Sequence, residues 1–252
     1  MTLSEGILQQ KLAQPFRYFP RVTSTNDLAK TWLMQGAPDG AVVIADEQAS
    51  GRGRSGRLWR TPPNAALALS IILRPPAALL ARVNMIGALC VFELATQVGC
   101  DDVGIKWPND IQVQDRKISG VLVEAVWMQD NLDGVVLGIG VNVRNDFSQT
   151  DLRELAASLE YVAGRPLDRA ELIKTLLERV DFWYQRIDAD QVFDTWRRRL
   201  NMLGHPVEAE GIRGRALDVT AEGSLLVEDH HGGLHEVSAG DVTAFTGQRS
   251  TE

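Results

Sequence analysis

Arginine and glycine alternate in one short stretch of the chain, GRGRSGRLW, which runs from Gly51 to Trp59. Three arginines within seven residues cannot all be buried and paired at low cost, so this stretch cannot belong to a hydrophobic core. Glycine lets the backbone approach a ligand closely, and the planar guanidinium of arginine suits a phosphate or a carboxylate. The stretch therefore predicts a mobile loop that closes over an anion. On composition alone, a solvated basic loop or a patch that touches nucleic acid is an equal alternative.

A second polar cluster, KWPND, covers Lys106 to Asp110. Pro108 fixes a turn and holds the residue before it extended. A lysine, the amide of Asn109 and a carboxylate grouped around such a turn could hold a phosphate together with a metal ion. Taken alone, however, the motif favours an Asn-Asp turn with an exposed lysine.

Two later segments carry polar groups beside glycines. In DRKISG, Lys117 precedes Gly120, and a glycine in a strand permits another group to pack closely against it. A lysine at a hairpin tip is otherwise a solvated edge charge. In GIGVNV, Asn142 could bind a base edge or only satisfy the backbone, and the missing last glycine excludes a dinucleotide-binding fingerprint. His230, His231 and His235 have a spacing close to that of a metal site, but no cysteine or fourth ligand accompanies them, so we favour a plain turn and assign no metal ligand.

Hydrophobic periodicity predicts the elements that must position these groups. TSTNDLAKTWLMQG has helical spacing, with Ser24, Thr25 and Asn26 able to cap its start. Helices are also predicted over 82–98 and after Asp168. The predicted strands are AVVIAD, AALALSIIL and GVVLGIGVNV, DIQVQDRKISGVLVEAVW is a predicted hairpin, and EQASGRGRSGR between the first two strands is a predicted loop.

The pattern changes near Gly204 to short alternating runs that are broken by glycine-containing turns. Several short strands at close spacing predict a small β-barrel. We therefore expect two domains, residues 1–203 and residues 204–252.

Composition limits the class of protein. The formal net charge of −7 argues against a general nucleic-acid-binding protein but allows a local basic site for an anionic small molecule. The N-terminal segment lacks a signal-peptide pattern, and no run approaches the roughly 18 apolar residues of a membrane span. Cys90 and Cys100 lie outside any CxxC motif and are expected to be reduced thiols. These features predict a cytoplasmic protein with no membrane partner.

The order of the motifs is more informative than any one of them. STN, Q..GRGRSGR.W, KWPND, DRKISGVLVE and GIGVNV succeed one another as in the biotin protein ligases, and the sequence closely resembles that family over about residues 18–245. The resemblance implies an α+β catalytic domain, with a mixed β-sheet and flanking helices related to class II synthetases, and a small C-terminal β-barrel. Some members add an N-terminal DNA-binding module. Too few residues precede Tyr18 for one, so we expect the single-function type without specific DNA binding.

The resemblance also implies a two-step reaction. With Mg²⁺, the biotin carboxylate attacks the α-phosphate of ATP to give biotinyl-5′-AMP and pyrophosphate. A lysine of the biotin carboxyl carrier domain of an acyl-CoA carboxylase then attacks the mixed anhydride, takes the biotinyl group and releases AMP. A carboxylate is already a nucleophile, so the first step requires positioning and charge neutralisation rather than a general base. The adenylate is prone to hydrolysis, so a loop that excludes water fits the glycine–arginine stretch. Family members also pair sheet to sheet, which leaves a homodimer open.

By resemblance, the motif residues fall into overlapping groups. Lys117 falls at the position of the biotin-carboxylate lysine, Lys106 faces the α-phosphate and Trp59 packs on adenine. The role of Asp110 stays open between orienting Lys106, binding Mg²⁺ indirectly and deprotonating the incoming lysine. The expected catalytic residues are Lys106, Arg54, Lys117 and Asp110; the biotin-binding residues are Ser24, Thr25, Asn26, Gln48, Gly51, Arg52, Gly53, Arg54, Lys117 and Gly120; the ATP-binding residues are Arg54, Arg57, Trp59, Lys106, Asn109 and Asn142.

Three other functions stay open at this point. A lipoate or octanoate ligase or transferase shares the catalytic fold, but the glycine–arginine loop with KWPND favours biotin. A nucleic-acid-binding regulator could use the arginines, and a biotin binder could lack activity. We also expect the loop to be disordered without ligand, because nothing apolar in Ala49–Gly56 anchors it.

Overall fold

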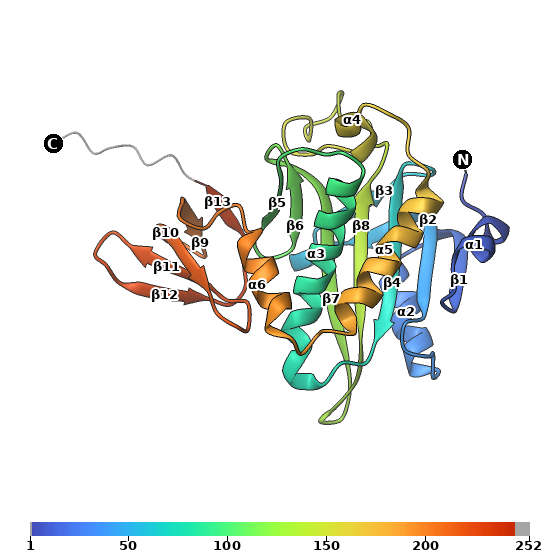
Figure 1. The fold of residues 1–252 in the computed structure, drawn as a ribbon, viewed down its shortest axis with the longest axis horizontal. Coiled ribbons are helices and arrows are strands. Elements are labelled where there is room, and N and C mark those ends of the chain that lie inside the picture. The colour runs from blue at the N-terminus through green and yellow to red at the C-terminus, as the bar shows by residue number, and fades with distance from the viewer. Residues whose placement is uncertain (1, 245–252) are drawn as a thin grey trace.

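The predicted apolar strands assemble into one large mixed sheet in the computed structural model, which describes residues 2–244 (Figure 1). Within those residues the large sheet has eight strands in the order β1-β2-β4-β8-β7-β6-β5, and β3 pairs with β2 outside that path. β1 runs parallel to β2, while the other pairs are antiparallel. The strands are β1 (Phe16–Val22), β2 (Val42–Arg52), β3 (Leu58–Thr61), β4 (Ala66–Leu73), β5 (Val103–Lys106), β6 (Asp110–Val113), β7 (Arg116–Met128) and β8 (Asn131–Asn142).

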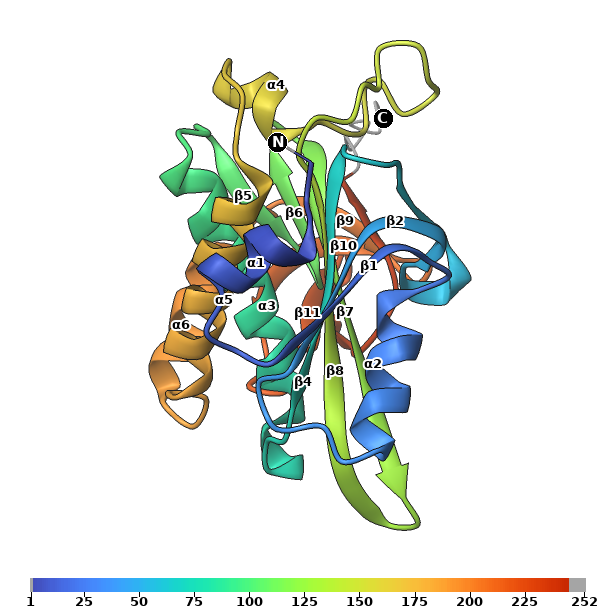
Figure 2. The ribbon, with the colours of Figure 1, turned by 90° about the vertical axis from the view of Figure 1, so that its right-hand side faces the viewer.

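Helices cover both faces of this sheet (Figure 2). α3 (Leu80–Gln97) and α5 (Arg169–Tyr184) contribute to the main hydrophobic core on one face. α2 (Thr25–Met34) lies on the opposite face, over Val43 and Ile72. The predicted α+β architecture with a mixed sheet is therefore confirmed. The remaining helices are short: α1 (Glu5–Lys11), η1 (Arg54–Gly56), η2 (Ala77–Leu79), α4 (Leu159–Ala163) and α6 (Asp190–Arg198).

The helical stretch Ala77–Gln97 is long and apolar enough to cross a membrane by length and composition alone. Its apolar side chains instead fill the core, where Ile86 and Leu89 are fully buried. Gly87 brings the helix close to the sheet, since a Cβ there would lie 2.7 Å from a methyl group of Val121. Packing against the sheet therefore accounts for the apolar composition of this helix.

Two local predictions need correction. The predicted loop from Glu47 begins as strand, because β2 continues to Arg52 by pairing its backbone with β3, and this pairing needs no apolar alternation. Ser24 is the N-cap residue of α2 but makes no side-chain capping hydrogen bond. The backbone N–H of Thr25 donates to the Gln48 side chain instead. The start of α2 is thus satisfied from a neighbouring strand.

The predicted hairpin at β6 and β7 is confirmed. Its two-residue turn is Gln114–Asp115, with φ values of 50° and 61°. Two successive positive φ values are what the tightest hairpin turns require. The turn thereby fixes the register that places Lys117 at the start of β7.

A second, five-stranded antiparallel sheet follows α6, in the order β12-β11-β10-β9-β13. It is joined to the first part of the chain by Arg197, which pairs with Asp218, and by the Trp107 indole, which donates to the Gly223 carbonyl at 2.7 Å. The division near residue 203 stays a prediction, and residues 245–252 of the predicted barrel lie outside the described residues. The strands are β9 (Pro206–Ala209), β10 (Ile212–Val219), β11 (Leu225–Asp229), β12 (Leu234–Val237) and β13 (Val242–Ala244).

Candidate active site

Small residues line up across the middle of the large sheet on the face that carries α2. Gly140 of β8 is the register partner of Gly120 of β7, which in turn pairs with Asp110 of β6, and Asp110 pairs with Lys106 of β5. Partners directly opposite one another project from the same face of a sheet. The row therefore begins with two glycines, which have no side chain, and ends with the carboxylate of Asp110 and the ammonium group of Lys106.

Two side chains lie directly on this bare backbone. A Cβ at Gly138 would come within 2.2 Å of Asn26 Oδ1, and a Cβ at Gly140 would come within 2.4 Å of Trp59 Nε1. Any larger residue would displace these groups. Gly120, Gly138 and Gly140 together form what we call the glycine floor.

An uncharged hydrogen-bonding cluster stands at one end of the glycine floor. Gln48 Oε1 accepts from the Thr25 N–H at 2.8 Å and lies 3.0 Å from the Thr25 hydroxyl. Ser70 Oγ lies 2.8 Å from that hydroxyl and donates to Asn26 Oδ1 at 2.6 Å. Thr25, Asn26 and Ser70 are all buried. We call Thr25, Asn26, Gln48 and Ser70 the polar pocket, and its oxygens and amides suit a neutral ligand that both donates and accepts hydrogen bonds.

A charged network lies beside the polar pocket and contacts it at Asn26. The Arg52 guanidinium makes a two-pronged contact with Asp27, and it lowers the pKa of that carboxyl. Glu124 accepts from Lys30 Nζ at 2.8 Å and from Asn26 Nδ2 at 2.7 Å. These pairs tie α2, the end of β2 and β7 together. The Arg52 side chain is thus engaged with carboxylates outside the polar pocket.

A second group of charges lies at the other end of the glycine floor. Lys117 Nζ is 2.6 Å from Asp110 Oδ1 and 5.6 Å from the centre of the Trp59 ring. A Cβ at Gly120 would sit 3.4 Å from the Lys117 ammonium, so the glycine keeps the path of this side chain open. Asp110 is therefore placed against Lys117, and this pairing disfavours the alternative in which it orients Lys106.

The arginines of the glycine–arginine stretch reach toward the second sheet. Arg54 Nη1 donates to the Gly240 carbonyl at 3.2 Å, and Arg57 pairs with Asp241 at 2.6 Å. Burial lowers the pKa of the Arg54 guanidinium, while the negative charges of Asp241 and Asp110 oppose that change. Arg54 therefore lies between the Lys117–Asp110 pair and the turn that precedes β13.

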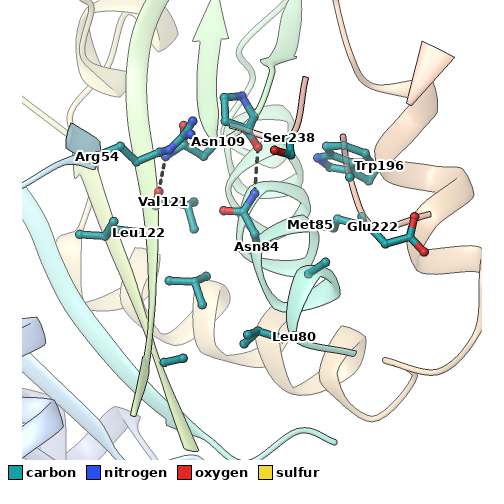
Figure 3. Close-up of a pocket in the computed structure, with 15 residues that line it drawn as sticks. Arg54, Leu80, Asn84, Met85, Asn109, Val121, Leu122, Trp196, Glu222 and Ser238 are labelled. Carbon is teal, nitrogen blue, oxygen red and sulfur yellow. Dashed lines mark hydrogen bonds between the residues drawn. The ribbon is translucent and has the colours of Figure 1, made fainter. Parts of the chain in front are cut away.

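The KWPND segment lines part of a cavity through Pro108 and Asn109. Arg54 and Asn109 line a cavity of about 320 Å³ together with α3, β7 and the second sheet (Figure 3). The Asn109 amide donates to the Val121 carbonyl, and Asn84 of α3 donates to the Pro108 carbonyl. Lys106 is half-buried at the end of β5. The cavity therefore begins at two of the predicted site residues, Arg54 and Asn109.

Comparison with known proteins assigns these motifs to one family. The chain matches the biotin/lipoate A/B protein ligase family over residues 18–142. It is 30% identical over 249 residues to the bifunctional ligase/repressor BirA of Bacillus subtilis, covering 94% of this chain and 76% of that protein. It is 31% identical over 219 residues to the biotin–[acetyl-CoA-carboxylase] ligase of Mycobacterium tuberculosis, covering 81% and 79%. The chain belongs to the biotin protein ligase family.

The structure agrees with this membership. It is similar to the biotin protein ligase of Aquifex aeolicus solved in complex with biotin and ATP, with a TM-score of 0.78 and 26% identity over 91% of this chain and 97% of that chain. The first sheet and its helices make up less than 91% of the chain, so the matched region must extend into the second sheet. The small second sheet is therefore part of the biotin protein ligase fold.

The structure brings most of the predicted site residues onto one face but leaves some with other partners. The Asn142 amide donates to the carbonyls of Lys117 and Ala157, at 3.4 and 3.2 Å.

Gly51 is required by close packing, since a Cβ there would lie 2.5 Å from the Trp59 carbonyl, whereas Gly53 is not crowded in this way. The Trp59 indole N–H is buried without a hydrogen-bond partner among the described residues. Trp59 thus covers the glycine floor, with its indole nitrogen packed against Gly140.

Several residues around the site were not predicted from the sequence. Ser70 is the polar residue of a strand that is buried throughout, and such a residue in an apolar run is a usable signal of a buried hydrogen bond. Glu124 interrupts the apolar run VLVEAV in a similar way. Asp27 and Lys30 carry no such signal, because charged residues are ordinary on a helix surface. Their roles depend on contacts between α2 and distant strands.

Proposed function

We propose that this biotin protein ligase activates biotin with ATP as biotinyl-5′-AMP and then transfers the biotinyl group to a lysine of a biotin carboxyl carrier domain. The observation that supports this best is the pairing of two chemically different regions on one face of the sheet. The uncharged polar pocket matches a ureido ring, and Lys117 with Arg54 matches the carboxylate and phosphate that must meet. The glycine floor connects the two.

In the first step, the protein would act by holding two anions together. Ser24, Thr25, Asn26 and Gln48 would hold the ureido ring, and the side chain of biotin would cross the glycine floor toward Lys117. Lys117 would then exchange part of its contact with Asp110 for the biotin carboxylate, while Lys106 and Arg54 offset the charge on the α-phosphate. Positioning and fixed positive charge are the main contributions available for such a reaction.

The nucleotide would occupy the side of the site nearest Trp59. The aromatic face of Trp59 would stack on adenine, with Arg57, Asn109 and Asn142 as further polar partners. Arg57 would have to leave Asp241 to reach phosphate. Mg²⁺ would be held mainly by the phosphate oxygens, because no group of three His, Cys, Asp or Glu side chains in the described part of the chain is arranged to hold a metal. When bound, Mg²⁺ would supply further charge neutralisation.

In the second step, the acceptor lysine must lose a proton and reach the mixed anhydride. Asp110 is the carboxylate of the central row, and its partner Lys117 would be engaged by biotin at this stage. Asp110 would thereby become available to take the proton of the incoming ammonium group. Arg52, Gly53 and Arg54 would cover the adenylate until the acceptor arrives, which limits hydrolysis.

The free edge of β7 supports a place for the acceptor. β6 pairs with β7 only up to Gly120, so from Leu122 onward one edge of β7 has no strand partner among the described residues. Leu122, Val123 and Ala125 line the cavity that ends at Arg54 and Asn109. An exposed edge can accept a strand from another chain. We expect a strand of the carrier domain to pair here, and a homodimer through the same edge would compete with it.

The decisive experiment is mass spectrometry of a biotin carrier domain incubated with this protein, biotin, ATP and Mg²⁺. The wild-type protein should add one biotin. An Arg54→Gly variant should release the adenylate and label bystander lysines, whereas Arg60→Gly, at an exposed arginine of β3, should label like wild type.

The other outcomes assign other functions. Modification with lipoate or octanoate but not with biotin would move the protein to the related ligases or transferases. No modification with any acid would leave only the fold, and salt-sensitive binding to random DNA would then favour the regulator. The reaction uses ATP and a carrier domain, so we place the enzyme in the cytoplasm. Fluorescence of a tagged full-length chain would test that location.

A further inference from the structure

Glu124 has no place in the two steps above, yet its contacts reach the base of the polar pocket. One carboxylate oxygen accepts from Lys30 at 2.8 Å and the other from Asn26 Nδ2 at 2.7 Å. Burial favours the neutral acid, but the hydrogen bonds from Lys30 and Asn26 and the charges of Lys30 and Arg52 outweigh it and lower the pKa of Glu124. The group is therefore an ionised carboxylate near neutral pH.

An ionised carboxylate can only accept hydrogen bonds, and this determines how the Asn26 amide must point. Its nitrogen has to face Glu124, so its oxygen faces Ser70. Asn26 is buried and lies against Gly138, so it cannot turn toward water instead. Glu124 thus sets the orientation of an amide inside the polar pocket.

With the amide held this way, the polar pocket lacks one proton. Three oxygen pairs are within hydrogen-bond distance: Ser70 to Asn26 at 2.6 Å, Ser70 to Thr25 at 2.8 Å, and Thr25 to Gln48 at 3.0 Å. Each pair needs a proton between its oxygens, but the Ser70 and Thr25 hydroxyls carry one each. Gln48 cannot supply another, because its oxygen accepts from the Thr25 N–H and its nitrogen donates to Thr61.

We propose that Glu124 is a positioning residue that makes the polar pocket a net hydrogen-bond acceptor, so that the pocket selects a ligand that brings an N–H group. This inference rests on the proposed function, in which the ligand is the ureido ring of biotin. An N–H placed between Thr25 Oγ1 and Gln48 Oε1 supplies the missing proton. Buried oxygens left without a donor are costly, so the free pocket is poised to bind such a group.

Replacing the carboxylate by an amide should reverse the orientation. In Glu124→Gln, the Lys30 ammonium can only donate, so the new amide must give its oxygen to Lys30 and its nitrogen to Asn26. Asn26 then turns its nitrogen toward Ser70, Ser70 donates to Thr25, and Thr25 donates to Gln48. All three contacts are then satisfied within the protein. The pocket no longer needs a donor from the ligand, although its shape is nearly unchanged.

The same logic predicts a rescue. Asn26→Asp alone places two carboxylates together and should abolish tight biotin binding. In the double variant Asn26→Asp with Glu124→Gln, the amide of residue 124 again gives its oxygen to Lys30 and now donates to one oxygen of the new carboxylate. The other oxygen accepts from Ser70, as in wild type. The double variant should therefore restore the acceptor character that Glu124→Gln removes, without the carboxylate repulsion of Asn26→Asp.

The test is the biotin and ATP dependence of adenylate formation, together with calorimetric binding of biotin, in the full chain. Glu124→Gln should weaken biotin binding by about tenfold or more and change the KM for ATP by less than about twofold. The double variant should return biotin binding to within about threefold of wild type. Lys30→Met, which leaves the carboxylate and its contact with Asn26, should cost less than Glu124→Gln. Glu178→Gln, at an exposed acid of α5, is the matched control.

Each contrary result has a defined meaning. Equal biotin binding by wild type and Glu124→Gln, no recovery in the double variant, or an equal loss in Lys30→Met would overturn the proposal. A loss that affects biotin and ATP equally, with a lower melting temperature, would assign Glu124 a purely structural role. If wild type itself binds no biotin, the proposed function fails, and that result is separate from any comparison among the variants.

Discussion

The polar pocket and the glycine–arginine stretch lie on the same face of one sheet, but they are built in opposite ways. Thr25, Asn26 and Ser70 are buried and hydrogen-bonded to one another, and none of them is charged. Arg54 and Arg57 are charged, they are half-buried and exposed respectively, and they contact the turn before β13. One region is fixed by packing, whereas the other is held by contacts that water and salt can replace.

This difference matches what each region has to do in the proposed reaction. A neutral ring offers only hydrogen bonds, so selectivity for it requires donors and acceptors that are already in place. Phosphate and carboxylate are attracted over longer distances, and the groups that bind them must also move to admit ATP and release AMP. Rigidity is therefore expected where the ligand is uncharged, and mobility where it is charged.

The largest expected effect is at the point where the two regions meet. Lys117→Met removes the ammonium group assigned to the biotin carboxylate and leaves Asp110 without its partner. We expect the rate of adenylate formation to fall about 10²–10³-fold, the range found when one charge-stabilising group is removed from an active site. Single-turnover formation of biotinyl-5′-AMP measures this directly.

Lys174→Met is a suitable control for that variant, because Lys174 is a half-exposed lysine of α5 that pairs with Glu178. It should leave the rate unchanged. A fall of less than about threefold in Lys117→Met would show that another group holds the biotin carboxylate. Lys117 would then not be the residue at which the two regions meet.

A smaller but more selective effect is expected inside the polar pocket. Ser70→Ala leaves Asn26 Oδ1 without its donor in a buried site. Loss of one buried partner costs about 1–3 kcal/mol, so biotin binding should weaken about 5- to 150-fold while the KM for ATP stays within about twofold. Ser224→Ala, which removes a buried serine hydroxyl just before β11, is the control. Equal losses for both substrates would mean that the two regions do not act independently.

The fold and the motif residues could be predicted from the sequence because their signals are local. The hairpin of β6 and β7 follows from alternation and a two-residue turn, and the motif order indicates the family. The partners of those motif residues could not be predicted in the same way. Ser70, Glu124 and Asn26 come from three separate elements, and their contact depends on the register between β4, β8 and β7.

The contacts of the glycine–arginine stretch could not be predicted from the sequence either. Its composition predicts a flexible loop, and nothing in it indicates that β2 extends to Arg52 or that Arg57 meets Asp241. Those features come from backbone pairing with β3 and from a second sheet that begins more than 140 residues later. Side-chain pattern carries little information about backbone pairing or about contacts between distant segments.

The smallest expected effect is at this distant contact. Arg57 and Asp241 are both exposed, and exposed pairs of this kind contribute at most about 1 kcal/mol to stability. Asp241→Asn should therefore lower the melting temperature by no more than about 4 °C. The variant should also release Arg57 and lower the KM for ATP modestly, because the guanidinium no longer has to leave a carboxylate before it meets phosphate. Asp130→Asn, at an acid in the turn between β7 and β8, should change neither quantity. A higher KM for ATP in Asp241→Asn would mean that the second sheet positions Arg57 for phosphate, and the stretch would then resemble the polar pocket in being held ready for its ligand.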